Sequence, residues 1–367
     1  MGAQLYSSPV GGLDGAVQTR EKIVPQRLGI DTYSLRSQGW DASKFLDYSA
    51  RLGLDNVHYS DPLIFGAFDS QDFARLKSQA DDLGLAIEVG LGSINKYAFG
   101  FHADRGTAES QLLHMIDAAT QTGSPVVRCF LGDHHERTGD VSLRQHMDEC
   151  VRTLKAVASQ ARDAGIHIAL ENHGGVDLLA RELRELVEEA GTDYVGVCLD
   201  TGNPAYAGEN PVQTVEILAP YAVTSHVRDT AIWESEDGAF AQWTVLGEGN
   251  VDLPRILAIM SDKAPNCPID LETITGLAPS ALTYLQSTSV FWSMYPDMLA
   301  VDLARFVALA REGKRRGIGP RKQIETAWGV RAIPPELIEP LRAQQLVDFE
   351  SSVTYARESL GLGVRGR

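Results

Sequence analysis

The chain has 367 residues, 44% hydrophobic and 22% charged, and 33 Lys and Arg against 49 Asp and Glu give a net charge of −16. This composition is typical of a globular protein with one large α/β domain or two smaller ones. The acidic balance argues against nucleic acid as a partner, because a negative surface repels phosphate backbones.

The N-terminal residues 1–26 are rich in glycine and polar residues and are expected to form an irregular arm. They lack the basic start and apolar core of a signal peptide, and the chain has no apolar run of about 18 residues that could span a membrane. The four cysteines are widely spaced, and Cys129 and Cys198 lie in apolar runs, as buried reduced thiols do. We therefore expect a cytoplasmic protein without membrane attachment.

Eight short apolar runs follow, most of them preceded by a turn that contains Gly or Pro. They are Leu28–Ile30, Asn56–Tyr59, Ala86–Leu91, Val126–Leu131, Ile166–Leu170, Val195–Leu199, Ala222–Thr224 and Ile269–Leu271. Continuous apolar runs of this length are typical of strands that are buried on both faces in a parallel sheet.

Between the runs, apolar residues recur at three- and four-residue steps, which predicts helices. These helices are expected over Ala42–Leu52, Ser70–Leu83, Thr107–Thr122, Ser142–Ala164, Leu179–Ala190, Pro211–Leu218 and Leu253–Met260. The alternation predicts a single (β/α)8 TIM barrel over residues 27–290. The alternative is an open doubly wound sheet, which usually begins with a glycine-rich phosphate turn after its first strand. No glycine occurs in Asp31–Ser34, so the barrel is favoured.

The remaining residues, 291–367, differ in character and predict a helical C-terminal extension outside the barrel. Val290–Gly313 is amphipathic, which predicts one helix over this range. Within the barrel region, Trp233–Gly238 contains three acidic residues and predicts a polar loop.

Four residues with metal-ligand chemistry stand where the fifth to eighth runs end: Glu171, Asp200, His226 and Glu272. Strand ends meet on the C-terminal face of such a barrel, where active sites lie. Three carboxylates and one imidazole on neighbouring strands would need a compensating cation, so these four predict a site for one divalent metal. The oxygen-rich donor set makes Mn²⁺ the first choice, with Mg²⁺, Co²⁺, Fe²⁺ or Zn²⁺ as alternatives.

Other residues on the same face are candidates for the reaction itself. His173 follows Glu171 by two positions and is predicted as an acid/base group, with a capping role as the alternative. His58 in the second run and His135 after the fourth are predicted to contact the substrate. Glu248 lies between two glycines that let the backbone approach a ligand, although a structural turn explains it equally well.

Several of these residues carry a resemblance to a known family. Glu171-Asn172, Asp200–Asn203, His226–Asp229, Gly247–Gly249 and Glu272 resemble the motifs of the xylose-isomerase-like barrel superfamily, especially its ketose 3-epimerase branch. The resemblance implies that the four strand-end residues hold Mn²⁺ or a similar ion. It also implies that Glu171 and Glu272 move the proton on either side of the substrate carbon.

The chain departs from that pattern at two positions. Relatives commonly have histidine where this chain has Asn203 and often have arginine where it has Ile232. Those positions help to hold the substrate in ketose epimerases, which argues against a simple free ketose. We expect Asn203 and the motif residue Arg228 to contact the substrate here.

The sequence therefore predicts a metal-dependent sugar isomerase or epimerase that removes a proton next to a carbonyl of a carbohydrate or oxidised sugar derivative. The alternative is a lyase, the catalytic subunit of a C-glycoside deglycosidase acting on 3-oxo-glycosides, which would need a small second subunit. Apurinic-site endonucleases share the barrel but need several metals and a basic DNA face. A non-catalytic sugar-binding barrel would not need four ligands. Homo-oligomerisation is left open.

Overall fold

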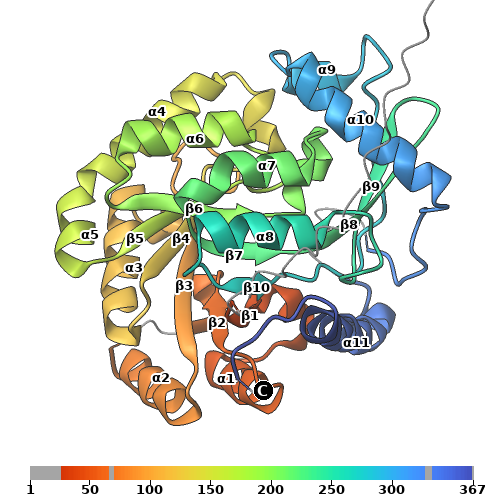
Figure 1. Cartoon of the computed structure of the whole chain (residues 1–367). Coiled ribbons are helices and arrows are strands. Elements are labelled where there is room, and N and C mark those ends of the chain that lie inside the picture. Colours follow the sequence, from red (N-terminus) through yellow and green to blue (C-terminus); the bar gives the residue numbers. More distant parts are fainter. Residues whose placement is uncertain (1–25, 66–69, 327–332, 366–367) are drawn as a thin grey trace, which may run out of the picture.

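A computed structural model of the chain describes residues 26–65, 70–326 and 333–365. Eight parallel strands form a closed barrel in the order β1-β10-β7-β6-β5-β4-β3-β2 (Figure 1). They are β1 (Leu28–Asp31), β2 (Asn56–Tyr59), β3 (Ala86–Ser93), β4 (Val126–Phe130), β5 (His167–Glu171), β6 (Val195–Asp200), β7 (Ala222–Val227) and β10 (Ile269–Leu271). Each overlaps one of the eight apolar runs, and the predicted (β/α)8 barrel is confirmed. The predicted N-terminal arm lies almost wholly outside the described residues.

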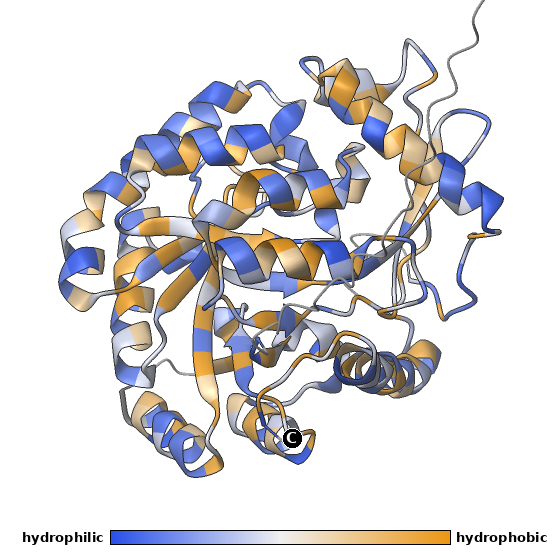
Figure 2. Ribbon diagram, viewed as in Figure 1, coloured by the Kyte–Doolittle hydropathy of each residue, from blue (hydrophilic) through white to orange (hydrophobic). Residues whose placement is uncertain are grey.

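Helices surround the barrel and connect its strands (Figure 1). They are α1 (Ala42–Arg51), α2 (Ser70–Leu83), α3 (Ala108–Thr122), α4 (Leu143–Ala156), α5 (Ala158–Ala164), α6 (Ala180–Ala190), α7 (Pro211–Leu218) and α8 (Leu253–Lys263). The central strands are largely hydrophobic, whereas the helices carry both hydrophobic and hydrophilic residues (Figure 2). The pattern is expected of helices that bury one face against a barrel. None of the helices in the described ranges is both long and apolar enough to cross a membrane.

The interior of the barrel is unusually polar. Such interiors are mostly filled by branched apolar side chains. Here the Thr224 hydroxyl donates a hydrogen bond to Glu88 Oε2, and because β3 and β7 are not neighbours in the ring, this bond crosses the inside of the barrel. Asn56 Nδ2 donates to both carboxylate oxygens of Asp270, at 2.9 and 2.8 Å. Burial raises the pKa of the Glu88 carboxyl group and of the Asp270 carboxyl group above their usual values.

A second, antiparallel sheet is formed by strands that come before and after β10 in the chain, and it was not predicted from the sequence. It consists of β8 (Asp229–Glu234), β9 (Ala239–Thr244) and β11 (Ser280–Leu282), in the order β11-β9-β8. The predicted polar loop Trp233–Gly238 overlaps the β8–β9 hairpin, and only residues 235–238 connect its strands.

The C-terminal segment contributes α9 (Val290–Met294), α10 (Ala300–Arg315) and α11 (Pro335–Glu358). The single helix expected over Val290–Gly313 is therefore divided in two. Pro296 follows Tyr295, whose backbone has left the helical region at φ −126° and ψ 57°. Proline disfavours helical geometry in the residue before it and cannot donate the helical hydrogen bond, so the helix ends there.

The two longer helices of this segment pack on different parts of the molecule, α10 on the second sheet and α11 on the segment after β1. A Cβ at Gly313 of α10 would lie 1.9 Å from the Ile232 carbonyl oxygen, so only glycine permits this approach to β8. On α11, Arg342 Nε donates to the Ser37 carbonyl at 2.6 Å and Gln345 Oε1 accepts from the Ser37 amide at 3.2 Å. The extension thus holds the segment that follows β1.

Asp348 of α11 links the extension to the segment after β10. Its buried carboxylate accepts two hydrogen bonds from Arg321 and one from the Thr275 hydroxyl, all at 2.7 Å. Asp348→Ala should lower the free energy of unfolding by about 3 kcal/mol, since it removes the buried partner of a largely buried arginine. Denaturant unfolding measures this loss. Glu339→Ala, which breaks an exposed pair with Arg342 on the same helix, should cost no more than about 0.5 kcal/mol. Equal losses in the two variants would contradict the expectation.

Candidate metal centre

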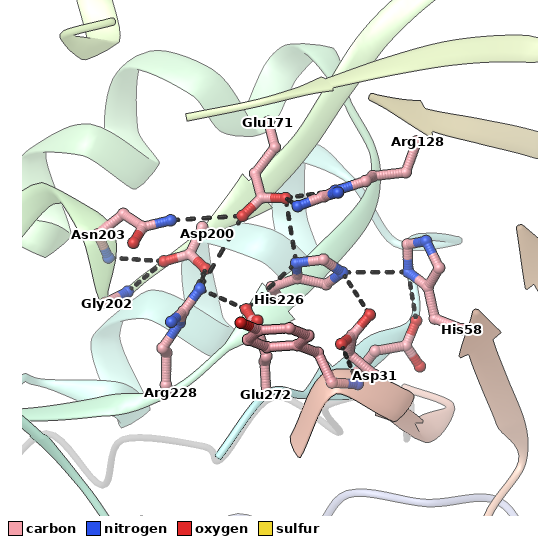
Figure 3. A network of polar contacts seen from close by, with 12 residues as sticks. Asp31, His58, Arg128, Glu171, Asp200, Gly202, Asn203, His226, Arg228 and Glu272 are labelled. Atoms are coloured by element: carbon pink, nitrogen blue, oxygen red, sulfur yellow. Dashed lines mark hydrogen bonds and ion pairs between the residues drawn. The ribbon is translucent and has the colours of Figure 1, made fainter. Parts of the chain in front are cut away.

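The four strand-end residues predicted as metal ligands meet at one place (Figure 3). Glu171 ends β5, Asp200 ends β6, His226 lies in β7 and Glu272 directly follows β10. These strands are neighbours in the ring. One potential ligand atom from each residue lies within 4.8 Å of all the others, and all four residues are buried.

Local hydrogen bonds fix the direction of the Asp200 carboxylate. Its Oδ1 accepts the backbone amides of Gly202 and Asn203 at 2.7 and 2.6 Å, so only Oδ2 is turned toward the other three residues. The Asn172 side chain joins the ends of β5 and β6, because it accepts from the Asp200 amide at 3.0 Å and donates to the Asp200 carbonyl at 2.9 Å.

The His226 ring carries the clearest sign of a ligand site. Its Nδ1 lies 3.3 Å from Glu171 Oε2 and 3.4 Å from Glu272 Oε2, yet it is buried and has no hydrogen-bond partner among the described residues. On the opposite side of the ring, Nε2 lies 3.2 Å from Asp31 Oδ2. Metal-bound histidines typically have such a carboxylate behind them, which fixes the ring and leaves the other nitrogen for the metal.

Two arginines already contact these carboxylates. Arg128 pairs with Glu171 Oε2, and Arg228 reaches both Asp200 Oδ2 and Glu272 Oε2 (Figure 3). Burial alone would raise the pKa of the Glu171 carboxyl, but Arg128 and His226 together hold it well below its usual range. Burial raises the pKa of Asp200 to about 7 against the opposing effect of Arg228.

His173 lies in the loop after β5, where two contacts orient its ring. The ring stacks on Phe130 with centroids 3.7 Å apart, and Nδ1 donates to the Gly132 carbonyl at 2.8 Å. Because a carbonyl only accepts, the proton resides on Nδ1, and Nε2 keeps a lone pair that takes no hydrogen bond in the described part of the chain. Burial lowers the pKa of the imidazole, which favours this neutral form.

Asn203 and His58, predicted to contact the substrate, adjoin the four residues. Asn203 Nδ2 donates to the Asn172 carbonyl at 2.8 Å and lies 3.3 Å from Glu171 Oε1. His58 lies behind the His226 ring, with Nδ1 3.2 Å from His226 Nε2. Its burial, together with His226, lowers its pKa to about 3, so this imidazole is neutral.

His135 and Glu248 are not brought to the four residues, with which neither forms a hydrogen bond or ion pair in the described part of the chain. The His135 side chain is 53% exposed, bonds to Asp133 through Nδ1 at 2.5 Å and stacks on Phe99. Glu248, also 53% exposed, pairs with Arg321 at 2.9 Å.

Three further residues of the site were missed from the sequence. Asp31 ends β1 and so follows the same strand-end rule as the four predicted ligands. Arg128 is a charged residue within the apolar run of β4, which should have marked it as an inward-facing cation. Asp177 accepts the amides of Gly132 and His173 at 3.0 and 2.9 Å and so anchors the His173 loop, but no sequence signal distinguishes it from a surface aspartate.

Comparison with known proteins shows which family the chain resembles. Residues 46–289 match the sequence profile of the family described as xylose isomerase-like TIM barrel. A relative named 3-oxo-isoapionate decarboxylase, from Pectobacterium atrosepticum, is 24% identical over 238 residues, which cover 61% of this chain and 77% of the relative.

Solved structures show the same fold. D-psicose 3-epimerase from Clostridium cellulolyticum H10 superposes with a TM-score of 0.55 at 16% identity, covering 80% of this chain and 99% of its own. A xylose isomerase-like TIM barrel protein from Mycobacterium smegmatis, solved in complex with magnesium, gives a TM-score of 0.55 at 15% identity, covering 78% and 97%. With the family profile matched over most of its length, the chain belongs to the xylose isomerase-like TIM barrel family.

Proposed function

We propose that this protein is a divalent-metal-dependent enzyme of the sugar isomerase and epimerase type, which removes a proton next to a carbonyl of a carbohydrate or oxidised sugar derivative. The observation that carries the proposal is the buried Nδ1 of His226, which has no hydrogen bond in the described part of the chain and faces the carboxylates of Glu171 and Glu272 within the cluster that Asp200 completes.

The donor set fits a divalent cation. Three carboxylate oxygens and one imidazole nitrogen suit Mn²⁺ or Mg²⁺, with Co²⁺, Fe²⁺ and Zn²⁺ also accepted by such ligands. Mn²⁺ remains our first choice. When bound, the ion would supply Lewis-acid stabilisation of the negative charge that develops on substrate oxygens.

The residues of the chain supply the proton chemistry. Glu171 and Glu272 approach the cluster from β5 and β10, on either side of His226, so one carboxylate could take the proton from the substrate carbon and the other could return it. Arg128 lowers the basicity of Glu171, because it stabilises the ionised carboxylate. Asn203 and Arg228 offer hydrogen-bond donors for substrate oxygens.

A lyase is the second candidate, and His173 favours it. A neutral imidazole with a fixed tautomer and a free Nε2 is a ready general base that is independent of the ligand set. Elimination from a 3-oxo-glycoside, or loss of a carboxyl group from a 3-oxo acid as the name of the Pectobacterium relative implies, would pass through the same kind of oxyanion as isomerisation. Ile232, where ketose epimerases often have arginine, is buried in β8 and offers no donor to a free ketose.

Metal removal tests the proposal. Purified protein should contain about one divalent ion per chain. Prolonged treatment with a strong chelator should abolish turnover of free, phosphorylated or 3-oxo sugars, including glycosides, and Mn²⁺ should restore it. Elemental analysis and activity assays on the same samples give the measurement. Protein without metal that is fully active in chelator would refute the proposal.

A further inference from the structure

Arg228 occupies a position that the proposed metal also requires. Its Nη2 contacts Asp200 Oδ2 and Glu272 Oε2 and lies 3.9 Å from Glu171 Oε1, while its Nε donates to Asp200 Oδ2 at 2.9 Å (Figure 3). One guanidinium thus reaches all three carboxylates of the proposed ligand set.

The overlap is sharpest at Asp200. The backbone amides of Gly202 and Asn203 already use Oδ1, so Oδ2 is the oxygen available to an ion. Arg228 donates two hydrogen bonds to that same Oδ2. A divalent ion and the guanidinium cannot both take the inward lone pairs of this oxygen and of Glu272 Oε2 at ordinary ligand distances.

The surrounding structure is built to hold Arg228 in this place. Its backbone is fixed by the Thr201 hydroxyl, which accepts from the Arg228 amide at 2.9 Å and donates to the Arg228 carbonyl at 2.8 Å. The guanidinium lies 4.4 Å from the centre of the Trp243 ring. Gly202 leaves room for the side chain, because a Cβ there would lie 2.6 Å from Arg228 Cγ and Cδ.

We propose that Arg228 is an internal counter-ion of the metal centre: it neutralises the ligand carboxylates in the metal-free protein and leaves them when the metal binds. The inference rests on the metal dependence proposed above and adds a competitor from the chain itself. Since the backbone anchor at Thr201 does not involve the guanidinium, rotation of the side chain is sufficient for the exchange.

The competition predicts opposite effects of one substitution. Arg228→Met keeps the apolar stem but removes the cation. Metal-free Arg228→Met should unfold at a lower temperature than the wild type, because the buried carboxylates of Asp200 and Glu272 lose their counter-ion. Its affinity for Mn²⁺ should be about 10–100-fold higher, because the ion no longer displaces charge-assisted hydrogen bonds. Isothermal titration of chelator-treated protein with Mn²⁺, and thermal unfolding with and without Mn²⁺, measure the two effects.

Arg137→Met is the matched control. Arg137 is also buried, also pairs with a carboxylate, that of Glu182, and also lies over an aromatic ring, that of Tyr295 at 4.6 Å. It contacts none of the four ligands, so this variant should lose thermal stability without a change in Mn²⁺ affinity. If Arg228→Met does not fold, Arg228→Lys serves instead, because a shorter ammonium makes fewer bonds and should still raise the affinity several-fold.

The outcomes separate this inference from the proposed function. Wild-type protein that binds Mn²⁺, together with an Arg228 variant that binds it equally well or more weakly, would overturn the counter-ion role and leave the metal dependence standing. If neither protein binds Mn²⁺, Mg²⁺, Co²⁺ or Zn²⁺ at millimolar concentration, the metal dependence fails and the counter-ion role fails with it.

Discussion

Replacing Glu171 or Glu272 by glutamine should lower turnover by about 10²–10⁴-fold, even when excess Mn²⁺ refills the site. Glutamine keeps the shape of the side chain and one oxygen ligand, but its amide cannot accept the proton. Metal affinity should also weaken, because a negative ligand becomes neutral. The loss of stability should be larger for Glu171→Gln, since Glu171 is the partner of the buried Arg128.

Metal content after dialysis against excess Mn²⁺, turnover, and exchange of substrate hydrogen with deuterated solvent are measured on each variant. Glu185→Gln is the control, because Glu185 lies on α6 with an exposed side chain that pairs with Arg144. Turnover that returns to the wild-type level once the metal is restored would show that the two glutamates are only ligands.

His173→Ala tests the competing base. If His173 takes the proton, its loss should leave metal content unchanged and reduce solvent deuterium exchange by about 10²–10⁴-fold. The geometry makes this a clean test, since Nδ1 is tied to Gly132 and Nε2 is the only free nitrogen of the ring. His102→Ala, which removes an exposed imidazole paired with Asp104 on the surface, should have no effect.

The two sets of variants assign the proton chemistry between them. Loss of exchange in both glutamine variants, with His173→Ala active, supports the epimerase-type reaction with its two glutamate bases. The opposite pattern moves the base to His173 and favours the lyase, and the search for a substrate would then turn to 3-oxo-glycosides and 3-oxo acids.

The barrel could be predicted from the sequence because each strand is buried on both faces and appears as an apolar run. The prediction of one helix over Val290–Gly313 was wrong for a local reason. The apolar periodicity continues across Pro296, but the helical backbone cannot continue there. The β8–β9 hairpin was not predicted because no turn signal separates β8 from β7, and the acidic Glu234–Asp237 segment suggested a loop.

The cluster of Glu171, Asp200, His226 and Glu272 could be anticipated because the end of a parallel strand determines where a side chain lies. The positions of Arg128 and Arg228 could not be predicted in this way. A long side chain can extend in several directions from its backbone position. Only the three-dimensional arrangement shows that both guanidinium groups turn toward the carboxylates. The role of Glu248 was also not predictable, because its side chain pairs with Arg321, a residue distant in the sequence.

The closure of the barrel determines when the proposed metal site becomes complete during synthesis of the chain. Glu272 follows β10, and β10 is the strand that completes the ring by pairing Leu28 with Ile269. A nascent chain on the ribosome contains Glu171, Asp200 and His226 before Glu272, so the fourth proposed ligand is missing until this last strand has emerged. Such long-range pairings form late in folding. Tight binding of the ion would therefore report completion of the ring, and a chain stalled before β10 should bind it weakly.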